Sequence, residues 1–129
     1  MVMAKIPYEK LKQEMEAWPD RWKGFDSDIP VGEKIVLAMH PSIQDMVNKG
    51  LALKTINRHQ TNLWLLGGEV VSRIHHDAEL RNLSGAELLL RFVEEEGGPY
   101  CRHNNTEEEQ RAFDGTCRKL YRFLQPPVR

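Results

Sequence analysis

The stretch of residues 53–76 constrains the fold of this chain more than any other part of it. Apolar residues recur here at the spacing of one helix face, at Ile56, Leu63, Val70 and Ile74. A second stripe, formed by Trp64, Gly68 and Val71, runs beside the first. A helix with two apolar sides packs against neighbours on both of them. We therefore expect residues 54–76 to form the central helix of a helical bundle.

Two glycines and an acid interrupt the apolar pattern in the middle of this helix. Gly67 and Gly68 each cost up to about 1 kcal/mol relative to alanine at an interior helix position. The compensation that we expect is the close approach of another helix, or room for the ring of Trp64. Glu69 follows directly. If it is buried it needs a cationic partner, for which the candidates are Arg58, Arg73 and Arg118.

Four further segments have helical patterns, at residues 8–17, 31–49, 84–96 and 106–124. Two of them begin with a capping box, Ser84 with Glu87 and Thr106 with Glu109. We expect the His40-Pro41 pair to break or restart the helix at 31–49, since proline suits a first helical turn. The predicted fold is all-α, a single small bundle of about five helices in one domain spanning 1–129. Within it, 1–30 is a less regular helix and loop, and 31–124 is the core.

The connection at residues 20–30 is predicted to be a loop that carries two large aromatic residues, Trp22 and Phe25. Buried aromatic rings contribute strongly to core packing. We expect these rings to hold the loop against the bundle. The alternative is that they form an exposed interface for another protein.

Composition and length agree with one globular unit, with 40% hydrophobic and 29% charged residues. No apolar run approaches the roughly 20 residues that cross a bilayer. The N-terminus lacks an apolar signal core, so we expect a cytoplasmic protein with no membrane partner. Two cysteines, Cys101 and Cys117, agree with a reducing compartment.

The sequence contains no pattern typical of an active site or a cofactor site. It has neither a nucleophile motif nor a phosphate-binding glycine loop. Two groups contain metal-ligand residue types, namely His75, His76 and Asp77, and Cys101, His103 and Cys117. Neither spacing matches a zinc motif, and Cys117 lies on an apolar helix stripe with Phe113, Leu120 and Leu124. We predict a non-catalytic chain with no metal and no cofactor.

Positive charge is concentrated on two of the predicted helices. Net charge is −1 for the whole chain, but it is +4 over 111–129 and −5 over 84–110. Clustered Lys and Arg on helix faces are typical of proteins that follow the phosphates of nucleic acids. The candidate DNA-binding residues are Lys54, Arg58, Arg111, Arg118, Lys119 and Arg122.

The alternative is that acidic segments pair with these arginines, at residues 94–96 or 107–109. The chain would then be a protein-interaction or self-association domain without nucleic acid. The orientation of the arginines distinguishes the two hypotheses.

Residues 40–124 resemble the SAM-like N-terminal core-binding domain of tyrosine recombinases (phage integrases). The similar residues are Gly50-Leu51, Lys54-Thr55-Ile56, His59 and 63–67, together with the closing helix at 111–124. The resemblance implies a small helical bundle that clamps DNA. It implies no recombination, because the catalytic domain of that family is absent, and His59 stands where the family often has tyrosine. The stretches 67–69 and 95–99 are similar to parts of small bacterial helical proteins, which implies no function.

Overall fold

The computed structural model describes residues 8–75, 77–101 and 103–125, and they form an all-α bundle. Four helices are long: α1 (Tyr8–Glu16), α3 (Ile29–Asn48), α4 (Leu53–Arg73) and α7 (Glu107–Leu124). Shorter helical segments lie between them: α2 (Trp18–Trp22), η1 (Asp26–Asp28), α5 (Ala78–Arg81) and α6 (Gly85–Leu90). No strand occurs in the described ranges. The predicted fold class is confirmed.

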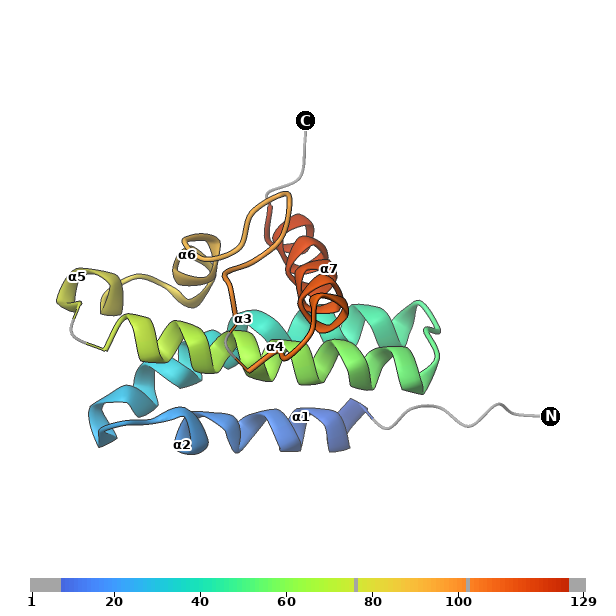
Figure 1. The fold of residues 1–129 in the computed structure, drawn as a ribbon. Coiled ribbons are helices and arrows are strands. Elements are labelled where there is room, and N and C mark those ends of the chain that lie inside the picture. Colours follow the sequence, from blue (N-terminus) through green and yellow to red (C-terminus); the bar gives the residue numbers. More distant parts are fainter. Residues whose placement is uncertain (1–7, 76, 102, 126–129) are drawn as a thin grey trace.

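The helices are arranged in three layers (Figure 1). The long helices α3 and α4 run antiparallel in the middle and are joined by a short turn at Gly50. This glycine has a φ of +75°, in the left-handed region that favours glycine. Helices α1 and α2 cover one side of the pair, and α6 and α7 cover the other. Helix α4 therefore packs on two sides, as its two apolar stripes predict.

The buried core is built mainly from stripes that the sequence shows. The first predicted stripe is fully buried at all four of its positions, which are Ile56, Leu63 and Val70 of α4 and Ile74 directly after it. Helix α7 adds Phe113, Cys117 and Leu120 from the predicted stripe. The N-terminal segment contributes to the same core through Leu11, Met15 and Trp18.

The predicted break at Pro41 is wrong, because α3 continues through it as one helix of 20 residues. A proline inside a helix leaves the carbonyl four residues earlier without its usual donor. Here that carbonyl belongs to Leu37, whose residue is 66% exposed, so water can reach this part of the helix surface. Burial of Ile35, Met39 and Ile43 on the opposite side holds the helix together across the proline.

Other predicted boundaries also need correction. The central helix ends at Arg73, three residues before its predicted end at His76, which lies outside the described residues. The capping box at Ser84 is confirmed, but its helix ends at Leu90 instead of continuing to 96. The predicted loop at 20–30 contains the end of α2 and the turn η1, and the connection after residue 76 contains α5. Short helical turns of this kind lack the periodic pattern that reveals a long helix.

Asp28 joins three parts of the fold that are distant in sequence. Its side chain is 1% exposed and accepts the backbone N–H groups of Gly24 and Phe25, at 2.8 and 3.1 Å. Its other contacts are with Arg81 Nη1 at 2.7 Å and His75 Nδ1 at 3.0 Å. The carboxylate therefore ties the η1 turn to the end of α4 and to α5.

Trp22 explains the paired glycines of α4. Its indole Nε1 donates to the carbonyl of Trp64 at 3.0 Å, and its ring lies against the backbone at Gly67. The expected room for a tryptophan ring exists, but the ring that fills it belongs to Trp22 and not to Trp64. The expectation that Trp22 holds its segment to the bundle is confirmed. Phe25 stays 59% exposed and stacks on His75, with ring centroids 4.5 Å apart.

The neighbouring acid, Glu69, is buried and pairs within its own helix. Its Oε2 accepts from Arg73 Nε at 3.1 Å, and the Glu69 side chain is 8% exposed. Arg73 was one of the three predicted partners, and the spacing of four residues places the two side chains on the same helix face.

Candidate functional site

The structure brings some of the predicted basic residues together and separates others. Lys54, Arg58, Arg111, Arg118 and Arg122 are exposed, and Lys119 is half-buried. Lys119 and Arg122 open on one hollow of about 460 Å³ between the C-terminal parts of α3 and α7. Its lining is Ser42, Asp45, Lys49, Lys119, Arg122 and Phe123. We name this feature the basic hollow.

The described residues that line the basic hollow carry three positive charges and one negative charge. Asp45 Oδ2 and Lys49 Nζ lie 2.9 Å apart, so the single acid is paired with one of the three cations. Within the described residues, Lys119 and Arg122 have no acidic partner at ion-pair distance. Two of the predicted residues thus retain free positive charge on a shared surface.

A polar network of buried and half-buried side chains joins α4 to α7. His59 Nδ1 lies 2.8 Å from Thr116 Oγ1, and Asn62 Nδ2 donates to the same oxygen at 2.9 Å. Burial lowers the pKa of His59, and the positive charges of Arg58 and Lys119 lower it further. The network joins α4 to α7, the helix that contributes Lys119 to the basic hollow.

The remaining predicted residues do not join this cluster in the same way. Arg118 Nη1 donates to the backbone carbonyl of Glu96 at 3.1 Å, so this arginine is turned toward the loop before α7. Arg111 stands two turns earlier, next to the acidic first turn at 107–109. Lys54 is exposed in the first turn of α4. The single basic face predicted for α7 is thus divided, because the loop at 94–97 folds back over part of it.

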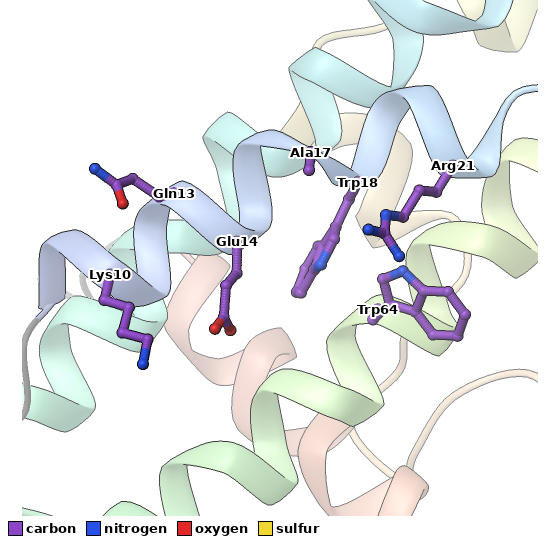
Figure 2. A pocket seen from close by; sticks show the side chains of 7 residues that line it. All are labelled: Lys10, Gln13, Glu14, Ala17, Trp18, Arg21 and Trp64. Carbon is purple, nitrogen blue, oxygen red and sulfur yellow. The ribbon is translucent and has the colours of Figure 1, made fainter.

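A second surface feature is a groove between the N-terminal helices and α4, centred on Trp64. This indole is 38% exposed. It borders three adjoining hollows of about 530, 480 and 200 Å³. Figure 2 shows Trp18 and Arg21 directed from the α1–α2 side toward Trp64 on α4. Lys10 and Glu14 line the same hollow, so its charged residues are of both signs.

The two groups of metal-ligand residue types form no assembled site within the described ranges, and His76 of the first group lies outside them. No group of three His, Cys, Asp or Glu side chains there could hold a metal ion. Cys101 and Cys117 are buried free thiols. Burial raises the pKa of Cys117, which keeps it a neutral thiol in the core. No helix in the described part of the chain has the length and apolar character that crossing a bilayer requires.

Comparison of the chain with protein-family models, with curated proteins and with solved structures gave no match. The resemblance to the recombinase core-binding domain therefore stays a prediction.

Sequence reasoning did not identify Lys49, Asp45 or Phe123 as parts of a site. Phe123 and Lys119 lie four residues apart, a spacing that places them on one helix face. That signal is local and visible in the sequence. The part played by Lys49 depends on how α3 packs beside α7, and no local pattern shows this.

Proposed function

We propose that this chain is a non-catalytic helical module that binds DNA through phosphate contacts at the basic hollow. The observation that supports it best is the gathering of Lys49, Lys119 and Arg122 around one surface depression. Arg58 on α4 is exposed and adds a further positive charge to the protein surface. Lys and Arg that converge from different helices are suited to the closely spaced charges of a phosphate backbone. Lys54, Arg111 and Arg118 are expected to contribute less to DNA binding.

The test is fluorescence anisotropy of a labelled random-sequence duplex at several salt concentrations. Three or four phosphate contacts predict a log–log slope against salt of about −3. In the double variant Lys119→Glu, Arg122→Glu, affinity at low salt is expected to fall at least about tenfold. The slope is expected to shrink by about two, one for each lost phosphate contact.

The matched control is the double variant Lys10→Glu, Arg21→Glu. It changes the net charge by the same amount at exposed residues of the other surface feature. An equal loss of affinity in both variants would show general electrostatic attraction of DNA to the protein without a defined binding surface. Absence of duplex binding by the wild type at low salt would contradict the proposal. Circular dichroism of each variant checks that the helices remain.

The groove at Trp64 favours a second candidate function, a protein-interaction or self-association domain. An exposed tryptophan at the centre of a groove is the residue type that most often anchors a protein interface. For self-association, Trp64→Ala is expected to shift the protein toward monomer in sedimentation velocity, and Lys119→Glu, Arg122→Glu is not. A wild type that is monomeric at high concentration would rule out self-association through this groove.

A further inference from the structure

Among the described residues, Phe123 is the one aromatic side chain that lines the basic hollow. It is 40% exposed although the core of α7 lies on the adjoining face. Lys119 precedes it by four residues and Arg122 by one. Residues four apart on a helix have their Cβ atoms about 5–6 Å from each other. The hollow therefore combines cations with an accessible aromatic ring. Their spacing is similar to that between the phosphate and the base of one nucleotide.

From this combination we infer that the basic hollow takes a single-stranded segment of nucleic acid, with a phosphodiester held by Lys119 and Arg122 and the neighbouring base stacked on Phe123. The inference rests on the proposed function and makes its ligand more specific. Proteins that bind single strands combine a positive groove with aromatic side chains, and each stacked base contributes about 1–3 kcal/mol.

A duplex would make fewer contacts with this site than a single strand would. Its bases are stacked on one another and present only their edges in the grooves, so protein contacts to a duplex go largely to phosphates and base edges. An unstacked base in a single strand offers its face to an aromatic ring. Lys119 and Arg122 can serve either form, whereas Phe123 contributes only when a base is free to stack.

The other polar groups of the hollow are compatible with this ligand. The carboxylate of Asp45 is paired with Lys49, which reduces its repulsion of a phosphate. Ser42 is buried and adds a polar side chain to the lining. The Trp64 groove fits a polyanion less well, because Glu14 lines two of its three hollows.

The experiment compares three labelled ligands of about 15 units, a length within the usual site sizes for single strands. These are oligo-dT, oligo-rU and a DNA duplex, each titrated by anisotropy into wild type and Phe123→Ala. The variant is expected to bind the single strands about tenfold more weakly, as loss of one stacked base predicts, and the duplex within about twofold. Phe123→Tyr is expected to bind like the wild type, because its ring also stacks.

Tyr100→Ala is the control, since Tyr100 is 70% exposed and lies outside the hollow. A preference for oligo-dT or oligo-rU identifies DNA or RNA as the source of the strand, and either supports the inference. Equal effects of Phe123→Ala on strand and duplex, or no effect on either, would overturn it. If the double variant Lys119→Glu, Arg122→Glu still weakens duplex binding in that case, the proposed DNA-binding function holds and only the inference about single strands is lost. Failure of every ligand to bind overturns both.

Discussion

Replacement of Asp28 with alanine is expected to lower the free energy of unfolding by about 3–5 kcal/mol. This is the range for removing one partner of a buried ion pair and leaving the other uncompensated. The substitution removes the acceptor for Arg81, His75 and two backbone N–H groups at once. These donors lie just before η1, just after α4 and in α5, so the loss separates the segments that the carboxylate joins. Urea denaturation followed by circular dichroism measures the effect.

Asp26→Ala is the matched control for this substitution. Asp26 also pairs with a cation, Lys23 at 3.2 Å, but its side chain is 92% exposed. Exposed ion pairs contribute about 0–1 kcal/mol, so the control is expected to change stability by less than about 1 kcal/mol. Similar losses in the two variants would contradict the role given to burial and to the four converging donors of Asp28.

The same carboxylate gives the wild type a defined response to acid. Burial, the largest influence, raises the pKa of Asp28, but hydrogen bonds from Arg81, Phe25 and Gly24 and the charge of His75 outweigh it. The result is a pKa lowered from 3.8 to about 2. A group with a lowered folded-state pKa stabilises fully above its unfolded value and loses that contribution as pH falls through the folded value. The stability gap between wild type and Asp28→Ala should therefore narrow between about pH 4 and pH 2.

The elements that sequence reasoning predicted well are those with local signals. The capping boxes at Ser84 and Thr106 are present because a side chain three residues away closes each of them. Glu69 and Arg73 meet because they are four residues apart on one helix. The first apolar stripe of the central helix is buried, and so are Phe113, Cys117 and Leu120 of the α7 stripe, because their spacing matches the helix period.

What the sequence did not reveal depends on contacts between distant segments. Pro41 predicts a break by local rules, yet buried residues on both sides of it hold α3 continuous. Arg118 and Arg122 look equivalent on a helical wheel, but only Arg118 meets the carbonyl of Glu96. The Asp28 junction involves residues about 50 positions apart. Such pairings follow from packing, which periodicity alone does not determine.

Gly67 and Gly68 are expected to respond in opposite directions to the same substitution. A Cβ at Gly67 would overlap the far edge of the Trp22 ring, whereas a Cβ at Gly68 would make ordinary contact with Trp22 Cδ1 at 3.4 Å. Alanine at an interior helix position is favoured over glycine by about 0.5–1 kcal/mol. Gly68→Ala should therefore stabilise by about that amount. Gly67→Ala should destabilise by about 1–3 kcal/mol, the usual effect of overpacking a filled site.

A double-mutant cycle with Trp22→Ala assigns the difference to the ring. Without the indole, the space beside Gly67 is open, so Gly67→Ala should change sign and stabilise as Gly68→Ala does. Urea denaturation of the four proteins of the cycle gives the coupling free energy. If Gly67→Ala raises stability in the presence of Trp22 as well, the ring is free to move aside. The paired glycines would then have no role in seating α2 on α4, and the hydrogen bond from Trp22 to the Trp64 carbonyl would hold the segment without them.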